Sequence, residues 1–329
     1  MNEIAKTIIQ ELKDRDGRES FSIVFLPYKY SMWDSMESVF EEAITANLNA
    51  YIYPVPYFTR GDNVLHHERK SFFKYKPYLL PHHYYFFKEF FGGKCPDYVV
   101  IHNPYDNHNK ITEVQEPYQT KALKERGSKI IYIPYSSMMQ SSNFISQMGV
   151  INSDYIVVSD DKEAKLYVDT WKRLVDVDIS DRLIIAGGHP KQDIASRVPE
   201  SVTVPGDWIK QGVFSRPVVS VFGGLVYTLN NPEECIECYK DIIFKEVLDG
   251  SCVLFRPHPL TRDGFEAMFP ADTILWDAFL EEIKPHAIID DTPDLYRAIH
   301  VCKRAYVDPS SVEDLLRWSG KKYKRIGVK

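Results

Sequence analysis

Cysteine is scarce in this 329-residue chain, and no long apolar run occurs in it. The five cysteines are too few, and odd in number, for a disulfide framework, which indicates a reducing compartment. No stretch approaches the ~18 apolar residues that a membrane-spanning helix requires. The first twenty residues mix acidic and basic side chains, so we expect neither a secretory signal nor a membrane span there. These absences favour a cytoplasmic protein.

An excess of basic charge is also missing, because the net charge is −6. We therefore expect no nucleic-acid partner. Internal repeats and low-complexity tracts are absent as well, which argues against a solenoid or a disordered tail. What the chain does have is a 44% hydrophobic share over 329 residues, more than one core usually holds. Two domains are the expected organisation.

Short β-rich apolar runs alternate with helical patterns along the chain. This alternation is typical of parallel βαβ units and predicts an α/β fold. The strand candidates of the first half are 21–28, 50–57, 97–105, 129–135, 154–160 and 182–190. Those of the second half are 217–224, 252–259, 273–277, 286–291 and 304–308.

The domain boundary is expected where this alternation lapses. The segment 191–216 lacks a clear period and contains prolines and glycines, which favours a linker. The first domain then covers 1–190 and the second covers 217–329. At the amino end, Ile4, Ile8, Ile9 and Leu12 fall on one helical face, which favours a helix packed on the first domain over one docked on a membrane.

The run VLFRPHPL (253–260) places a histidine between two prolines at a strand end. Proline fixes its own φ and restricts the residue before it, so Pro257 and Pro259 leave Arg256 and His258 little backbone freedom. We interpret His258 as a side chain held for presentation rather than as a core histidine. Ligands of parallel α/β sheets bind beyond the carboxyl ends of the strands, where this turn lies.

Other strand ends of the second half are followed at once by helix starts. Thr292 is a good N-cap before Pro293 and Asp294. Ser310 and Glu313 have the spacing of a capping box, and Ser311 adds a hydroxyl. Each is either only a well-capped helix or a helix end that binds phosphate. Gly223 and Gly224, after another strand, would admit a ligand close to the backbone.

The order of these motifs resembles the CDP-glycerol glycerophosphotransferase family of teichoic-acid and capsule polymer synthesis. The shared pattern is strand–FGG, strand–RPHP (256–259), a strand ending in D-[ST] (291–292) and a strand followed by D-x-S-S (308–311). GGHPKQD (187–193) is similar to the family's turn at the end of its first domain. The resemblance covers roughly residues 20–320.

This resemblance implies a GT-B-like fold, with two Rossmann-like domains whose parallel sheets face a central cleft. It implies a cytidine-diphosphate donor held mainly by the second domain and a polymer or lipid-linked acceptor at the first domain or the membrane surface. His258 would contact the donor phosphates. The diphosphate and nucleotide would be bound by Gly188, Gly223, Gly224, Arg256, Asp291, Thr292, Ser310 and Ser311. No cofactor is implied, and Mg²⁺ on the diphosphate is left open.

One departure from the family concerns the catalytic base. The family's tryptophan–histidine–glycine turn is replaced by IPYSSMM (133–139), which has no histidine. The base candidates nearby are His102 and His108 with Asp106, although His102 fits a strand-end residue that bonds backbone equally well. A glycosyltransferase or epimerase of the same fold, or a nucleotide-binding scaffold without turnover, therefore stays open beside the transferase.

Three other stretches are singled out. Cys235 and Cys238 have metal-like spacing, but their helical context favours packing, and nothing requires a metal. RKSFFKYK (69–76) is basic and aromatic, which fits an anionic acceptor or lipid head groups at the inner membrane face as well as a half-buried loop. The tail 321–329 is interpreted as a solvated end.

Overall fold

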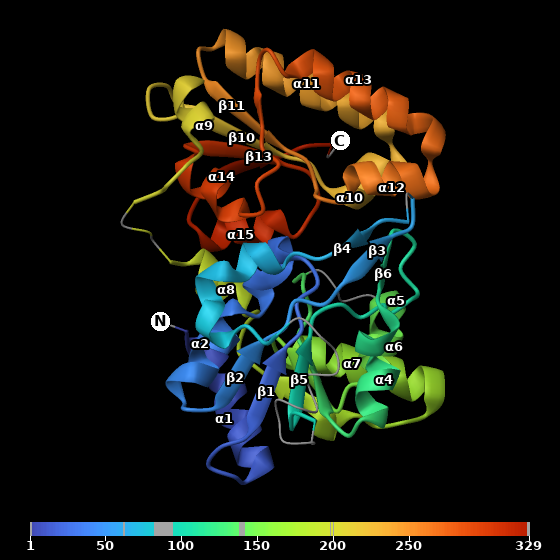
Figure 1. Cartoon of the computed structure of the whole chain (residues 1–329). Coiled ribbons are helices and arrows are strands. Elements are labelled where there is room, and N and C mark those ends of the chain that lie inside the picture. Colours follow the sequence, from blue (N-terminus) through green and yellow to red (C-terminus); the bar gives the residue numbers. More distant parts are fainter. Residues whose placement is uncertain are drawn as a thin grey trace. The chain divides into compact units, whose positions relative to one another are not determined.

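The computed structural model describes residues 2–61, 63–81, 95–137, 142–197, 199 and 201–327. The chain divides into two compact units (Figure 1). The N-terminal unit comprises Met1–Phe58 and Val64–Ile194, and the C-terminal unit comprises Thr59–Asn63 and Ala195–Lys329. The segment 191–216, expected as a linker, contains the helices α8 (Lys191–Ala195) and α9 (Gly206–Lys210).

The N-terminal unit is built on a parallel sheet, which has six strands among the described residues, in the order β2-β1-β5-β7-β8-β9. Its strands are β1 (Ser22–Phe25), β2 (Asn49–Ile52), β5 (Tyr98–Ile101), β7 (Lys129–Tyr132), β8 (Tyr155–Val158) and β9 (Leu183–Ile185). The strands are rich in buried β-branched and aromatic residues because helices cover both faces of a parallel sheet. Each coincides with a strand expected from the sequence.

Helices connect the strands of this unit. They are α1 (Glu3–Asp16), α2 (Glu37–Thr45), α4 (Thr120–Glu125), α5 (Ser142–Ile145), α6 (Met148–Ile151) and α7 (Asp161–Val175), with the 3₁₀ helices η1 (Tyr30–Ser35), η2 (Arg69–Tyr78), η3 (Glu116–Tyr118) and η4 (Ser180–Arg182). The predicted apolar face of α1 is confirmed, since Ile4, Ile8, Ile9 and Leu12 are buried in the core of the unit. A short sheet that the sequence did not predict consists of β3 (Tyr57–Thr59), β4 (Leu65–His66) and β6 (Thr112–Val114).

The C-terminal unit has its own parallel sheet, with five strands among the described residues, in the order β12-β11-β10-β13-β14. Its strands are β10 (Val218–Phe222), β11 (Cys252–Arg256), β12 (Ile288–Ile289), β13 (Arg304–Val307) and β14 (Lys322–Arg325). Its helices also include α10 (Leu225–Asn230), α11 (Pro232–Leu248), α12 (Thr261–Met268), α13 (Thr273–Ile283), α14 (Leu295–Val301) and α15 (Val312–Trp318), with the 3₁₀ helix η5 (Pro270–Asp272). In Figure 1, α11 and α13 lie side by side over the sheet.

Two expectations for this unit were wrong. The run 273–277, predicted as a strand, is the start of α13, because Trp276, Phe279 and Ile283 recur at helical spacing and are buried while Ile274 is 78% exposed. The tail is not simply a solvated end, since Lys322–Arg325 pairs with β13 as the parallel edge strand β14. Its lysines and arginine suit an exposed edge because charge discourages further strand pairing.

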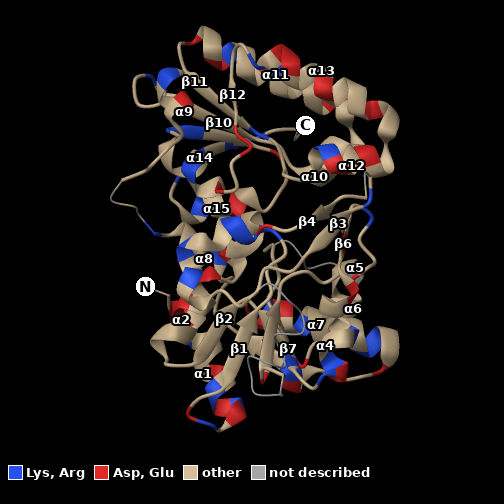
Figure 2. Ribbon diagram, in the orientation of Figure 1, with Lys and Arg blue, Asp and Glu red and all other residues tan. Residues whose placement is uncertain are grey.

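Charges of both signs are interspersed along the helices of both units (Figure 2). This distribution agrees with the modest net charge of the sequence. Among the described residues, none of the helices combines the length and the apolarity needed to cross a bilayer.

Candidate functional site

Four neighbouring strands of the C-terminal unit end in one row. The register pairs Phe222 of β10 with Arg256 of β11 on one side and with Val307 of β13 on the other. On the far side of β11, Phe255 pairs with Ile289, the last residue of β12. The residues that follow these ends therefore share the carboxyl edge of the sheet, where parallel α/β sheets bind ligands. The convergence expected from the sequence is confirmed.

Arg256 and the residue opposite it form a buried ion pair. The Arg256 Nη1 atom lies 2.6 Å from Asp290 Oδ2, and the two side chains are 5% and 0% exposed. Nη1 also lies 3.4 Å from Thr292 Oγ1. The other oxygen of the carboxylate, Asp290 Oδ1, accepts hydrogen bonds from the Thr292 hydroxyl (2.7 Å) and backbone N–H (3.0 Å). A buried guanidinium is thus held at the strand edge by a carboxylate that is itself fixed.

The sequence predicted this corner only in part. Asp291, named there, is exposed, whereas the buried Asp290 beside it makes the contacts. Thr292 is not the N-cap of α14, because the helix begins at Leu295 and the Asp294 side chain accepts from Tyr296 N. The signal for Asp290 was its place opposite Arg256, which becomes visible only once the strand register is known.

The FRPHP turn holds its histidine by hydrogen bonds to the residues that follow it. The His258 Nδ1 atom accepts from Leu260 N (3.1 Å), and its carbonyl oxygen accepts from Thr261 N (2.9 Å) at the start of α12. A neutral ring whose Nδ1 accepts carries its proton on Nε2. The half-buried His258 therefore has a fixed tautomer and orientation in which Nε2 is the donor.

The glycine pair after β10 is fastened to Asp308 at the end of β13. Asp308 Oδ2 accepts from Gly224 N and from the Tyr239 hydroxyl, the latter at 2.8 Å. A Cβ atom on Gly224 would lie 2.5 Å from Asp308 Oδ1, so any larger residue here must displace the carboxylate. Burial raises the pKa of Asp308, and the bonds from Gly224 and Tyr239 oppose the rise. Asp308 fixes the turn by which Gly223 and Gly224 enter α10.

The capping box predicted for α15 is absent. Glu313 binds Tyr323 (3.1 Å) and Arg325 (2.8 Å) instead of reaching back to the helix start, and the N-cap residue Ser311 makes no side-chain capping bond. The Ser310 Oγ atom is buried without a hydrogen-bond partner among the described residues. It lies near enough to the Asp308 carboxyl to lower the pKa of Asp308. Among the described residues, neither Ser311 nor Glu313 therefore caps the backbone N–H groups in the first turn of α15.

In the N-terminal unit, His102 follows β5 and is fully buried. Its Nε2 atom accepts from Tyr28 N (3.3 Å), and its Nδ1 atom lies 3.1 Å from Ser35 Oγ and 3.2 Å from Met32 O. Burial, together with the charge of Lys191, lowers the pKa of His102 to about 3. Both ring nitrogens are engaged, so this geometry lends no support to His102 as the base that meets a substrate.

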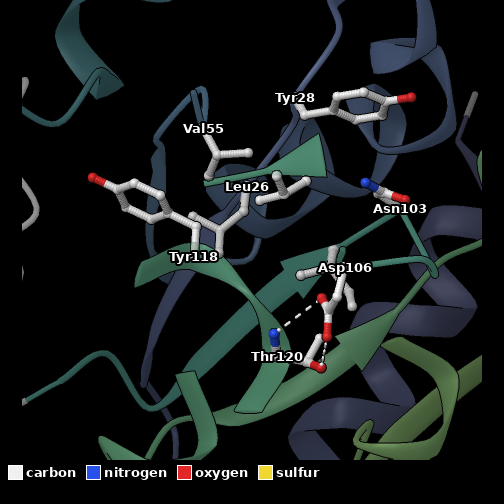
Figure 3. Close-up of a pocket in the computed structure, with 9 residues that line it drawn as sticks. Leu26, Tyr28, Val55, Asn103, Asp106, Tyr118 and Thr120 are labelled. Atoms are coloured by element: carbon white, nitrogen blue, oxygen red, sulfur yellow. Dashed lines mark hydrogen bonds between the residues drawn. The ribbon is translucent and has the colours of Figure 1, made fainter. Parts of the chain in front are cut away.

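Asp106, its proposed companion, adopts a left-handed backbone conformation (φ 51°) and is buried. Its carboxylate accepts from the Thr120 hydroxyl (2.5 Å) and backbone N–H (3.1 Å), and burial raises its pKa (Figure 3). It lines a cavity of about 20 Å³ among Leu26, Tyr28 and Tyr118, which is room for about one water molecule. The exposed His108 lies on the following turn. The arrangement is that of a loop anchor.

Gly188 lies in a turn that packs against helix α1. A Cβ atom on Gly188 would lie 2.7 Å from Ile4 Cδ1 of α1. The next residue, His189, bonds Pro134 O through Nε2 (2.9 Å), and burial lowers its pKa to about 3. Lys191 forms a buried ion pair with Asp34 at 3.0 Å. The donor role predicted for Gly188 stays a prediction, since these contacts describe a structural turn.

Two remaining expectations concern the base and the cysteines. Residues 138 and 139 of IPYSSMM lie outside the described residues, and Tyr135 bonds the Tyr105 hydroxyl at 3.2 Å. Cys235 is buried on α11, where burial raises its pKa to about 12, so it packs as predicted. Within the described ranges, no group of three or more histidine, cysteine or acidic residues has the geometry to hold a metal ion.

Comparison with known proteins finds structures of similar fold. No protein-family model matches the chain, and no curated protein does. It is similar to the UDP-GlcNAc 2-epimerase of Methanocaldococcus jannaschii solved with UDP-GlcNAc and UDP (10% identity, 93% of this chain and 83% of that one, TM-score 0.55). It is also similar to the UDP-GlcNAc 2-epimerase of Neisseria meningitidis bound to UDP-GlcNAc (10% identity, 92% and 81%, TM-score 0.56).

The wall teichoic acid polymerase TagF has a TM-score of 0.45 at 13% identity, covering 97% of this chain and 73% of that one, which is too distant to add to this comparison. Membership of the glycerophosphotransferase family and the central cleft stay predictions. The epimerase likenesses, at 10% identity, show the fold alone. They confirm the predicted fold class: the chain is a GT-B-like α/β protein with two Rossmann-like units, each built on a parallel sheet.

Proposed function

We propose that this chain is a transferase that takes a polyol phosphate, such as glycerol phosphate, from a CDP-activated donor and passes it to a cell-envelope or capsular glycopolymer precursor. The observation that carries the proposal is the row of strand ends in the C-terminal unit. There the buried Arg256, the oriented His258 and the Gly223–Gly224 turn converge on one sheet edge. The resemblance of their order to the glycerophosphotransferases supplies the donor class.

The proposed reaction is a displacement at phosphorus. The acceptor hydroxyl oxygen bonds to the phosphorus that carries the polyol, the bridging P–O bond of the diphosphate breaks, and CMP leaves with the bonding electrons. Negative charge grows on the leaving phosphate, which positioned donors stabilise. In this proposal His258 donates from Nε2, Arg256 supplies the positive charge, and the Ser310 and Ser311 hydroxyls bind phosphate oxygens. The proton of the acceptor hydroxyl is released to solvent.

A second candidate is a nucleotide-sugar epimerase or glycosyltransferase that uses a uridine donor. The likeness to epimerases solved with UDP-GlcNAc favours it. The same sheet edge would then bind the diphosphate of a UDP-sugar. A nucleotide-binding scaffold without turnover is a third reading, favoured by the engaged ring nitrogens of His102.

The acceptor side of the proposal rests on η2. Phe72 of this helix is buried, whereas Phe73 is 58% exposed. Lys70 and Lys76, near it in the sequence, are exposed, and Lys74 pairs with Glu37 at 2.9 Å. Exposed cations around an apolar ring suit an anionic polymer or lipid head groups, which supports peripheral contact with the inner membrane face. Sedimentation with anionic vesicles tests this contact, and a Phe73→Ser variant that sediments equally would contradict it.

Calorimetric titration tests the donor class. The ligands are CDP, CDP-glycerol, CDP-ribitol, UDP and UDP-GlcNAc, each titrated into the wild type and into His258→Ala. We expect binding confined to cytidine ligands and weakened about tenfold or more in the variant, which corresponds to about 1.4 kcal/mol. Selective uridine binding would support the second candidate instead. CDP binding without product from any polymer or lipid-linked acceptor would support the scaffold.

A further inference from the structure

The side-chain contacts of the Arg256 guanidinium are made by one of its three nitrogen atoms. Its Nη1 atom makes both of the side-chain contacts described, to Asp290 and to Thr292. Among the residues that the structure describes, the Nε and Nη2 groups donate to nothing. These two N–H groups are parallel and form the side of the guanidinium that grips two oxygens of one phosphate or carboxylate.

Asp290 is more tightly held than a simple counter-ion needs to be. Its backbone N–H donates to Phe255 O (2.8 Å), which places it opposite Arg256, and both Thr292 donors bind its second oxygen. Taking two charges out of water costs free energy that their attraction does not always return. A fixed buried pair at a strand edge therefore suggests a role in orientation besides stability.

We propose that Asp290 and Thr292 are positioning residues, which hold Arg256 by Nη1 so that its Nε–Nη2 edge receives two oxygens of one phosphate of the nucleotide diphosphate. The inference rests on the proposed function for the identity of the nucleotide. It adds a geometric requirement, since a lysine at position 256 keeps the charge but lacks the planar pair of donors. Thr292 acts on Arg256 through Asp290 and through its own contact with Nη1, and Asp290 acts through Arg256.

The test uses Thr292→Val, which removes the hydroxyl donor to Asp290 in a half-buried place, and Thr292→Ser as its matched control. Affinities for CDP, UDP and inorganic pyrophosphate are measured by calorimetry, with the melting temperature of each variant. Removing one hydrogen bond of the support should weaken binding about three- to tenfold. Thr292→Ser should bind as the wild type does, and Arg256→Lys should bind at least as weakly as Thr292→Val.

The double variant separates positioning from general damage. If Thr292 acts through the guanidinium, Thr292→Val has no further effect on affinity in the Arg256→Lys background. An equal loss in both backgrounds, or unchanged affinity in Thr292→Val while Arg256→Lys is weakened, would overturn the inference. Melting temperatures that fall while affinity stays constant would make the cluster purely structural and overturn it too.

The wild type distinguishes this inference from the proposed function. Binding of pyrophosphate with the pattern above, but of neither nucleotide, would uphold the positioning of Arg256 and overturn the nucleotide donor. Absence of binding for all three probes would overturn both.

Discussion

The carboxyl edges of the two sheets carry similar residues, but these residues differ in burial and in their hydrogen-bond partners. In the N-terminal unit, His102, His189 and the Lys191–Asp34 pair are buried, and their polar atoms contact one another, the Ser35 hydroxyl or the backbone. In the C-terminal unit, Arg256 keeps two donor groups without a partner among the described residues, and His258 is half-buried. The same topological position is thus occupied by a buried polar cluster in one unit and by a candidate binding edge in the other.

The difference shows what separates a site from a structural cluster. Both edges contain a buried ion pair, so burial of charge alone does not mark the site. What marks it is the guanidinium of Arg256, whose Nε and Nη2 donors have no partner among the described residues.

The largest expected effect comes from removing the buried cation of each pair. Arg256→Met and Lys191→Met each remove the counter-ion of a buried carboxylate, which should cost about 3–5 kcal/mol of unfolding free energy. Only Arg256→Met should also lose CDP affinity once conditions keep both variants folded. Chemical denaturation and calorimetry measure the two quantities. Equal loss of CDP affinity in both variants would contradict the proposal that only the C-terminal edge binds the nucleotide.

Acid should unfold the N-terminal unit first. Burial lowers the pKa of His102 and of His189 to about 3, below the ordinary value of 6.5. Their neutral forms therefore stabilise the fold above pH 6.5, and this stability is lost as the pH falls from 6.5 towards 3, by about 3 kcal/mol or more for the two together. Asp308 in the C-terminal unit and Asp106 in the N-terminal unit act in the opposite direction, because burial raises the pKa of each carboxyl and so favours the folded state as the pH falls.

Hydrogen exchange followed by mass spectrometry from pH 7 to pH 4, corrected for intrinsic rates, checks this order of unfolding. A His189→Gln variant, which lacks one of the titrating rings, should lose less stability over that range. Earlier opening of peptides from the C-terminal unit would contradict the assignment.

A methyl group on Gly224 should damage the candidate edge with a moderate loss of stability. The added Cβ would lie 2.5 Å from Asp308 Oδ1, so the carboxylate must shift and release Gly224 N. We expect Gly224→Ala to cost about 2 kcal/mol and to weaken CDP binding. Gly250→Ala is the matched control, since its backbone is strained by the change (φ 81°) but no atom lies within 4 Å. Equal CDP affinity in both variants would remove Gly224 from the site.

The smallest effect on stability is expected at Ser311. Its side chain makes no capping bond, so Ser311→Ala should change the unfolding free energy by less than about 0.5 kcal/mol. If the hydroxyl binds a phosphate oxygen, donor affinity should still fall about threefold. Thermal melts and CDP titration measure the two effects. Loss of stability with full affinity would show a structural hydroxyl instead.

The sequence predicted the strands of both sheets except β14, because their runs are short, β-rich and bounded by turn residues. It failed at 273–277, where five residues have strand-like composition and only the following Phe279 and Ile283 reveal the helical period. It placed the N-cap of α14 two residues early, since Thr292 and Asp294 are both good caps, and the Thr292 hydroxyl binds Asp290 instead of capping the helix.

The candidate site was predicted as a set of strand ends but not as a network. Arg256, His258 and the two glycines were found from local motifs, whereas Asp290 depends on the register between β11 and β12. The burial of His102 depends on Tyr28 and Ser35, which are distant in sequence, so no local pattern distinguishes it from an exposed strand-end histidine.

The central claim is that the carboxyl edge of the C-terminal sheet binds the donor diphosphate. A hydrogen-exchange difference map of the full chain with and without saturating CDP tests it most directly. We predict slowed exchange in segments 223–228, 256–262 and 308–314, with little change in 186–193. Slowed exchange at 186–193 with none in those three segments would contradict the claim and move the donor site to the other unit.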